Sequence, residues 1–294
     1  MSLSGLGDML SVGILNGGLY ALMAAGLALI LGVMSVANFA HGEFYLLGAY
    51  FGFSFTASLG LNPILGIIMA AVCAFVAGSL VERVLFYPLR KRSQEDWILN
   101  TFLLTVGLSM VIQNGAQLIG GMKYRGIPQY WKGVVRVGGT SMSVDRAVAF
   151  LISITAIVAL WLFLDRTRLG RAFRAVAQDE AGAALLGVNL HQIENLAFGL
   201  STALAGLAGA SLLSITKAYP SMGATPLNMS WYVIILAGLG NIRGSIVSGF
   251  IVGLLQSVSY QFLGSGWPQA LNLGLISLLL LLRPTGLFGT AVKD

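Results

Sequence analysis

The stretch "GLALILGVMSVANFAHGEFYLLGAY", Gly26 to Tyr50, decides the fold class of this chain. It joins two apolar runs through a short polar interruption that contains Asn38, His41 and Glu43. Ionisable groups are expensive inside hydrocarbon, so such an interruption marks either a working site or a place where a membrane helix breaks.

The composition of the whole chain indicates a membrane protein. Of its 294 residues, 56% are hydrophobic and only 10% are charged, and the mean hydropathy is +0.84. A soluble globular domain carries about 25% charged residues. The sequence therefore predicts an all-α, polytopic membrane helix bundle, with a single transmembrane domain over residues 1–294.

The charged residues and the single cysteine exclude several functions. The chain has 17 Lys and Arg against 11 Asp and Glu, but the cations cluster in a few loops, which favours orientation in a membrane over nucleic-acid binding. A lone Cys73 cannot form an internal disulfide or a cysteine metal site. The N-terminal "MSLSGLGDML" lacks the charged region and cleavage site of a signal peptide, so we expect the first span to be retained.

Long apolar runs give the number of spans. A bilayer core of roughly 30 Å needs about 20 apolar residues per helix. Runs of that order lie near residues 12–33, 42–58, 64–86, 98–120, 147–164, 195–216, 230–262 and 269–282. The seventh run is too long for one span and is interrupted by "GLGNIRGS", which predicts a broken or re-entrant helix near 238–245 and eight or nine spans in total.

Two short cationic loops predict the orientation. "YPLRKRSQED" (87–96) and "DRTRLGRAFRAVAQDEAG" (165–182) are separated by two predicted spans, so both can be cytoplasmic and the N-terminus then lies outside. Arg283 and Lys293 favour a cytoplasmic C-terminus. The segment 121–146 carries five cations and counts against this orientation; we interpret it as a structured extracytoplasmic loop whose cations are available to a docking partner.

Small residues recur at four-residue intervals along several predicted spans. Such spacing gives a smooth helix face that lets backbones approach closely, so we expect a compact bundle. The stripes are Gly13–Gly17–Ala21–Ala25, Gly48–Gly52, Ser201–Ala205–Gly209 and Ser245–Gly249–Gly253.

The polar interruption after the first span has two interpretations. Asn38 can cap a helix that begins near Phe39, and Glu43 then falls in its first turn, where the helix dipole favours a carboxylate. His41 and Tyr45 share a face that Glu43 does not, so a His–Glu couple within this helix is not expected. The stretch is either a structural cap or hinge, or it lines a transport path or gate. A metal site is not expected, because the only other histidine, His191, lies in a distant loop.

The second cationic loop carries more helix signals than a plain loop needs. In "TRLGRAFRAVAQDEAGAALLGVN", Arg171 and Arg174 lie three residues apart on one helical face, and Asp179 and Glu180 follow. Gly187 is well placed to end a helix. We expect a short amphipathic helix, a break and a second short helix, which would suit a groove on a partner; the alternative is a solvated loop that only obeys the positive-inside rule.

Motifs for catalysis and nucleotide binding are absent from the sequence. "AGLGNIRG" lacks the spacing of a dinucleotide-binding motif, and there is no phosphate-binding loop, no Ser-His-Asp arrangement and no cluster of metal ligands. Asn241 and Arg243 are better interpreted as polar groups at a helix interruption, as in discontinuous transporter helices. We therefore expect no enzymatic activity and no cofactor in this chain.

Five blocks in order resemble the membrane permeases of branched-chain amino-acid ABC importers, specifically the shorter of the two paralogous permeases. They are "GLALILGVMSVANFAHGEFYLLGAY", "LGRAFRAVAQDEAGAALLGVN", "LAFGLSTALAGLAGASLL", "ILAGLGNIRGSIVSGFIVG" and "RPTGLFG", and they cover nearly the whole chain. The resemblance implies a type II-like importer fold in a bacterial inner membrane. It also implies four kinds of partner: a second paralogous permease, two cytoplasmic ATPase subunits that bind ATP and Mg²⁺, an extracytoplasmic substrate-binding protein, and membrane lipid.

The resemblance also assigns roles to residues. It identifies residues 165–194 as the coupling loop to the ATPases, a divergent relative of the E-A-A-x-x-x-G loop, with Gly170, Arg171, Arg174, Asp179, Glu180 and Gly187 as its coupling residues. Here Glu180 is followed by Ala181 and Gly182, and Gly187 lies seven residues after Glu180 instead of the usual six. Residues expected in the translocation path or gate are Asn38, His41, Glu43 and Asn241.

The resemblance leaves the substrate open. It implies hydrophobic, branched-chain amino acids, for which the path must be apolar with a few hydrogen-bonding groups. The amide side chains Asn16, Asn38, Gln113, Asn114 and Asn228 are available for that purpose, and nothing ranks them. Urea, short amides or other neutral amino acids are alternatives within related permeases. An ion-coupled secondary transporter is a more distant alternative, since acidic residues are nearly absent from the middle of the spans.

Overall fold

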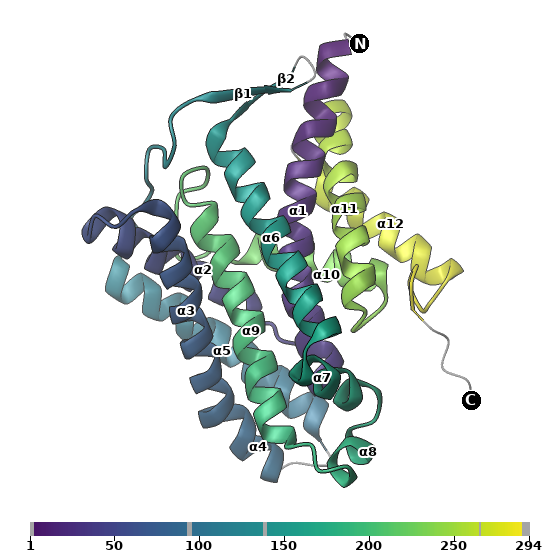
Figure 1. Cartoon of the computed structure of the whole chain (residues 1–294). Coiled ribbons are helices and arrows are strands. Elements are labelled where there is room, and N and C mark those ends of the chain that lie inside the picture. The colour runs from purple at the N-terminus through teal and green to yellow at the C-terminus, as the bar shows by residue number, and fades with distance from the viewer. Residues whose placement is uncertain (1–2, 93–95, 138–139, 265, 290–294) are drawn as a thin grey trace.

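A computed structural model of the chain describes residues 3–92, 96–137, 140–264 and 266–289 (Figure 1). Nearly all described elements are α-helices, which confirms the all-α prediction. Their bounds are α1 Leu3–Met34, α2 His41–Phe53, α3 Pro63–Val81, α4 Tyr87–Arg92, α5 Trp97–Gly120, α6 Val144–Arg166, α7 Arg168–Gln178, α8 Glu180–Leu185, α9 Leu190–Ser211, α10 Ala224–Ala237, α11 Ile242–Leu263 and α12 Pro268–Leu282. Two π-helical turns follow α2 and α3, and a small antiparallel hairpin joins β1 (Val134–Val137) to β2 (Thr140–Ser143).

Within the described residues, six helical segments are long and apolar enough to cross a membrane. They are Gly7–Met34, Pro63–Arg92, Trp97–Gly120, Val144–Arg166, Leu190–Ser211 and Ile242–Leu263. The predicted spans near 42–58, the first part of 230–262 and 269–282 contain the shorter helices α2, α10 and α12 instead. The chain is thus a polytopic helix bundle that combines long helices with short ones.

Helix α1 runs antiparallel to α11 along a seam of small residues. The backbone of α11 at Gly253 lies against Gly13 and Gly17, and Gly249 lies against Ala21, so closely that a Cβ on either α11 glycine would overlap backbone atoms of α1. This contact confirms the small-residue stripe predicted for both segments. Close approach of this kind lets two membrane helices gain dispersion contacts over their full length.

A second seam joins α9 to α2 and α3. Gly48 of α2 packs on Gly206 of α9, and Gly209 lies under the carbonyl of Tyr45. On its other side α9 packs on α3, where Thr202 donates a hydrogen bond to the carbonyl of Ala74 at 3.0 Å. The stripe that contains Gly209 was predicted to pack on a neighbouring helix, and it does.

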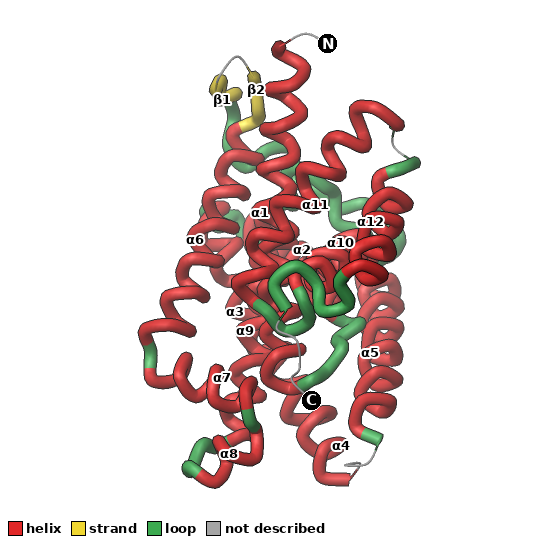
Figure 2. Tube along the Cα trace, turned by 90° about the vertical axis from the view of Figure 1, so that its right-hand side faces the viewer, coloured by secondary structure: helices red, strands yellow, loops and turns green. Residues whose placement is uncertain are grey.

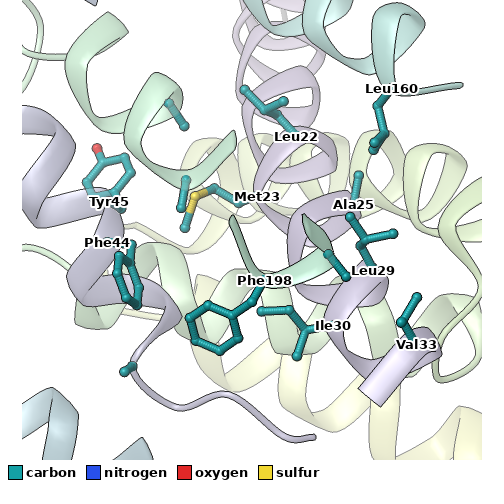
Figure 3. Close-up of a cluster of buried hydrophobic side chains, with 14 of the residues drawn as sticks. Leu22, Met23, Ala25, Leu29, Ile30, Val33, Phe44, Tyr45, Leu160 and Phe198 are labelled. Carbon is teal, nitrogen blue, oxygen red and sulfur yellow. The ribbon is translucent and has the colours of Figure 1, made fainter. Parts of the chain in front are cut away.

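The main core lies where α1 meets α2, α6 and α9. Figure 3 shows Ile30 of α1 beside the ring of Phe198 of α9, with Phe44 of α2 near that ring. The rings of Phe44 and Phe198 meet edge to face with centroids 5.9 Å apart. These fully buried side chains fix α1 as the central helix of the bundle.

The two ends of the bundle differ in character. The β1–β2 hairpin and the start of α1 lie at one end, while α4, α7 and α8 lie at the other (Figures 1 and 2). The two cationic loops therefore lie at the same end of the bundle, as predicted. The described residues of the segment 121–146, which are 121–137 and 140–146, lie toward the opposite end. Phe288 donates a backbone hydrogen bond to Ala237 at 3.0 Å, which places the last described residues beside the end of α10; Lys293 lies outside the described part.

The helix interruption predicted near 238–245 is present. Gly238 and Gly240 adopt φ values of +99° and +77°, which a glycine tolerates far better than other residues. Asn241 caps the next helix by accepting a hydrogen bond from the amide of Gly244 at 2.8 Å. The break covers 238–241, and α11 begins at Ile242.

A second interruption separates α1 from α2, and here one prediction is wrong. We expected Asn38 to cap a helix beginning near Phe39, but α2 begins at His41, and the residue before it, Ala40, offers no side-chain cap. Asn38 instead accepts a hydrogen bond from the amide of Ala40 at 3.0 Å. Its side chain therefore closes the turn that precedes the helix, because the chain must first reverse direction after Met34.

Candidate functional site

A cavity of about 560 Å³ lies between α1, α9 and α10, on the side of the bundle that carries the hairpin. Its walls are mostly apolar or aromatic. The lining residues are Leu15, Asn16, Leu19, Tyr20, Met23, Tyr45, Tyr124, Arg146, Ala149, Ala208, Leu212, Ile215, Thr216, Lys217, Tyr219, Met222, Thr225 and Pro226. A space of this size is in the range of small-molecule sites.

The charged lining of this cavity is entirely cationic. Arg146 at the start of α6 and Lys217 in the segment after α9 line it, and no Asp or Glu does. The rings of Tyr124 and Tyr219 lie beside each other with centroids 5.3 Å apart. Apolar walls with cations suit a solute that has a carboxylate and an apolar side chain.

The loop next to the cavity is held in place by buried contacts. Tyr130 donates a hydrogen bond to the carbonyl of Ala210 at 3.3 Å, and burial raises the pKa of its hydroxyl to about 12, so the donor keeps its proton. The amide of Trp131 donates to Asp145 at 2.8 Å. The described parts of the segment, residues 121–137 and 140–146, are therefore structured over this end, as the sequence predicts.

His41 lies just outside the floor of the cavity. It is fully buried, and its Nε2 donates a hydrogen bond to the carbonyl of Met23, which lines the cavity, at 3.0 Å. Its Nδ1 lies 3.4 Å from the hydroxyl of Ser201. His41 thus ties α2 to α1 and α9 at the level of the cavity floor.

Glu43 and Asn38 occupy separate positions. Glu43 accepts a hydrogen bond from Ser109 of α5 at 3.1 Å, whereas the side chain of His41 is directed to Met23 and Ser201. Asn38 closes the turn before α2 and is fully buried. Neither side chain lines the 560 Å³ cavity. Their assignment to the path or gate stays a prediction.

The segment 165–194 forms the two short helices that the sequence predicts. Thr167 caps α7 through the amide of Gly170 at 2.9 Å, and Asp179 caps α8 through the amide of Gly182 at 3.0 Å. Gly187 ends α8 with φ of +83°. The predicted break between the helices is Asp179 itself, whose extended backbone turns the chain.

Close packing holds α7 against the end of α6. The backbone of Gly170 lies so near the carbonyls of Phe163 and Leu164 that a Cβ there would overlap them. Arg174 donates a hydrogen bond to the carbonyl of Leu164, while Arg171 is exposed. Helix α7 is therefore packed directly on the end of α6.

Arg174 and Asn241 meet at a smaller cavity of about 230 Å³, at the end of the bundle that carries α7. The cavity lies between α1, α6, α7 and the break before α11, and Arg243 at that break pairs with Asp165 at 3.1 Å. Asn241 donates to the carbonyl of Phe288 at 2.8 Å. Arg174, the predicted coupling residue, and Asn241, the predicted path residue, thus line the same cavity.

Arg90 connects the two cationic loops. It pairs with Glu180 of α8 at 2.9 Å and with the buried Glu194 of α9. Beside it, the buried Glu82 accepts a hydrogen bond from Asn195 at 2.6 Å and lies 3.5 Å from His191. Glu180 therefore already forms an ion pair within the chain, with Arg90.

Sequence reasoning missed most of the cavity. Of the amides proposed for substrate contact, Asn16 lines it, whereas Tyr20, Arg146 and Lys217 were not assigned to a path and Tyr45 was noted only as sharing a helix face with His41. One sequence signal pointed to this region. Pro220 and Pro226 flank an irregular stretch that begins shortly after Lys217. Among the described residues, no group of three or more His, Cys, Asp and Glu side chains is placed to hold a metal ion.

Comparison with known proteins assigns the family. The family described as "Branched-chain amino acid transport system / permease component" matches residues 9–283. No solved structure matches the chain significantly.

Three curated relatives show the extent of the similarity. The chain is 31% identical to the high-affinity branched-chain amino acid transport system permease protein LivH of Escherichia coli K12, over 94% of this chain and 93% of the relative. It is 31% identical to BraD of Pseudomonas aeruginosa, over 94% of each chain, and 27% identical to LivM of E. coli K12, over 92% of this chain and 67% of the relative. The chain therefore belongs to the branched-chain amino acid permease family, and it is a multi-pass membrane transport subunit.

Proposed function

We propose that this chain is one of two paralogous permease subunits of an ATP-driven importer for branched-chain amino acids in a bacterial inner membrane. The observation that carries the proposal is the 560 Å³ cavity, whose apolar wall suits an aliphatic side chain and whose cations suit a carboxylate. The names of LivH and BraD as branched-chain amino acid permeases support the same substrate class.

The orientation follows from the two ends of the bundle. The end with α4, α7 and α8 carries the short cationic loops, and the positive-inside rule makes it cytoplasmic. The 560 Å³ cavity then lies on the extracytoplasmic side, below the cover formed by 121–146, where a substrate-binding protein would dock. We expect the six long segments to cross the membrane, and α2, α10 and α12 to make three further crossings together with the non-helical segments beside them, which would make nine spans.

The coupling loop would transmit ATP-driven motion. Two cytoplasmic ATPase subunits would bind ATP and Mg²⁺ and contact α7 and α8, since these helices project from the cytoplasmic end (Figure 2). Because α7 is packed on the end of α6, closure of the ATPases would move α6, whose first turn supplies Arg146 to the cavity. Transport requires two discrete arrangements that both ATP and the loaded binding protein bias.

Filling the cavity tests this function. We expect Ala149→Phe to lower leucine uptake by about tenfold or more, the factor that a loss of roughly 1.4 kcal/mol in binding gives. Ala149 is buried and lines the cavity, whereas Leu151, two residues later, is 60% exposed on the outer face of α6. Leu151→Phe is therefore the matched control and should keep normal uptake.

The assay uses proteoliposomes with the whole importer and follows radiolabelled leucine with and without ATP. Equal uptake by both variants would contradict the cavity as the path. Competition by urea or short amides instead of leucine would favour the alternative substrates, and uptake driven by an ion gradient without ATPase subunits would favour a secondary transporter.

A further inference from the structure

The α5 segment is the least buried of the six long apolar segments among the described residues, yet it is less apolar than the α3 and α6 segments. Only 6% of its apolar stretch is buried, against 28% for both the α3 and the α6 segments. A helix that faces lipid should be the most apolar, yet the mean hydropathy of α5 is 1.5 and that of the other two is 2.6. The least covered span is therefore too polar for its surroundings.

The inner side of α5 is easy to identify. Thr101 and Thr105 are buried, and Thr105 donates a hydrogen bond to the carbonyl of Ala37 at 3.3 Å. By helical periodicity, Gly107 and Asn114 lie on the opposite side of the helix from Thr105. We define the α5 ridge as the residues on that outer side, which are Asn100, Leu103, Gly107, Met110, Asn114 and Leu118.

The α5 ridge carries polar groups that the bundle leaves uncovered. Asn114 is exposed; its amide donates to the carbonyl of Met110 at 2.7 Å, and its carbonyl oxygen has no partner among the described residues. A Cβ on Gly107 would find no atom within 4 Å. Asn114 lies six residues before the end of α5, about 9 Å along the helix axis, so it sits within the hydrocarbon layer.

The exposed face of α3 shows what a lipid-facing surface looks like in this protein. Along its length that face presents only aliphatic side chains and methionine, such as Ile68, Val72, Val76 and Leu80. The α5 ridge differs because it interleaves amides and a glycine with its apolar residues. An unpaired amide in hydrocarbon is unfavourable, and a glycine in a membrane helix allows a second backbone to approach closely. The ridge therefore meets protein at membrane depth.

We infer that the α5 ridge is the surface that contacts the second, paralogous permease. This inference rests on the proposed function, which requires two permeases. This chain aligns with LivM over 92% of its length, so a paralogous partner would have the same fold. Two chains of one fold pair through equivalent surfaces around a two-fold axis, and a helix with amides and a glycine on its outer side suits such a contact.

Photo-crosslinking identifies what covers the ridge. In a Cys73→Ser background, Asn114→Cys and, as a matched lipid-facing control, Val76→Cys are labelled with benzophenone maleimide in native membranes that contain the whole importer, and then irradiated. We expect Asn114→Cys to give an adduct whose peptides belong to this chain and to a second permease, and Val76→Cys to give no protein adduct. An Asn114→Cys adduct with a second copy of this chain, or none with any protein, overturns the inference.

A bulky substitution provides an independent readout. Because a Cβ on Gly107 would meet no described atom within 4 Å and Gly107 is exposed on the outer side of α5, Gly107→Trp should leave the folding of this chain and its thermal unfolding unchanged. We expect it to lower the amount of co-purified second permease by about tenfold, while Val76→Trp keeps the wild-type amount. Retention of the second permease by Gly107→Trp would contradict the inference.

Uptake by the wild-type membranes separates the two proposals. If leucine uptake depends on ATP but Asn114→Cys gives no protein adduct, the proposed function is supported and the α5 ridge is not the surface that contacts the second permease. Absence of leucine uptake removes the proposed function and, with it, the role given to the ridge.

Discussion

Arg90 holds together three segments that are distant in sequence. Its guanidinium pairs with Glu180, whose side chain is 46% exposed, and with Glu194, whose side chain is 3% exposed. An ion pair that is open to solvent adds little stability, whereas a buried carboxylate that loses its cation is strongly unfavourable. The contact of Arg90 with Glu194 therefore contributes more to stability than its contact with Glu180.

This inequality predicts the outcome of two substitutions. Arg90→Gln should lower the free energy of unfolding by about 3–5 kcal/mol, because it leaves Glu194 buried without a cation. Glu180→Gln should lower it by about 1 kcal/mol or less. The measurement is an unfolding titration in mixed detergent micelles, and equal losses for the two variants would show that Glu194 is not held by Arg90.

The residue-level predictions from sequence were uneven for a physical reason. The place of Glu43 in the first turn of α2 and that of Gly187 at the end of α8 depend on residues close by in the chain, so both could be predicted from the sequence. The pair between Arg90 and Glu180 joins positions 90 residues apart, and no local pattern records it. Asn38 was wrongly predicted to cap a helix that begins near Phe39, because the sequence does not show how the chain reverses direction between α1 and α2.

Among the helices, the seam between α2 and α9 is the tightest contact that a small substitution can test. Gly48→Ala should lower the free energy of unfolding by about 1–3 kcal/mol, because the added methyl overlaps the backbone of Gly206. Gly115→Ala in α5 has open space and should stabilise by about 0.5–1 kcal/mol through helix propensity. Thermal unfolding of the purified chain measures both, and a loss at Gly115 similar to that at Gly48 would contradict the seam.

Helix α7 gives a second test, this time of transport. We expect Arg174→Glu to uncouple the ATPases, so that hydrolysis continues while uptake falls, because the carboxylate would repel the carbonyl of Leu164 and loosen α7 from α6. A Gly187 replacement should act alike, since φ of +83° disfavours other residues. Arg136→Glu makes the same charge change at the opposite end and serves as the control. Normal uptake by Arg174→Glu in proteoliposomes would show that the contact between α7 and α6 is not needed for coupling.

Helix contacts were more predictable than the cavity. Stripes such as Gly249–Gly253 are periodic, and periodicity survives in the sequence as a packing signal. The cavity instead gathers Tyr20, Arg146 and Lys217 from three separate segments, so it exists only after the bundle has formed. The exposure of α5 was not predictable from the sequence for the same reason, because it depends on how the other helices pack in the folded bundle.

The orientation of the whole chain can be tested with single cysteines. In a Cys73→Ser background, we expect Lys132→Cys to react with a membrane-impermeant maleimide in cells whose outer membrane has been permeabilised, because it lies in the extracytoplasmic cover. Arg92→Cys at the end of α4 should react only in inverted vesicles. Both positions are exposed, so access to the reagent depends on the side of the membrane alone. Labelling of Arg92→Cys from outside would invert the assignment.

The meeting of α2 and α10 has a steric consequence for the molecule. Both helices begin at mid-depth, where the backbones of Gly42 and Gly223 touch, while α1 and α9 continue through the same level as unbroken rods. A Cβ on either glycine would overlap backbone atoms of the other segment. Any larger residue at position 42 or 223 would therefore force α2 and α10 apart, so the place where the two short helices meet depends on glycine at both positions.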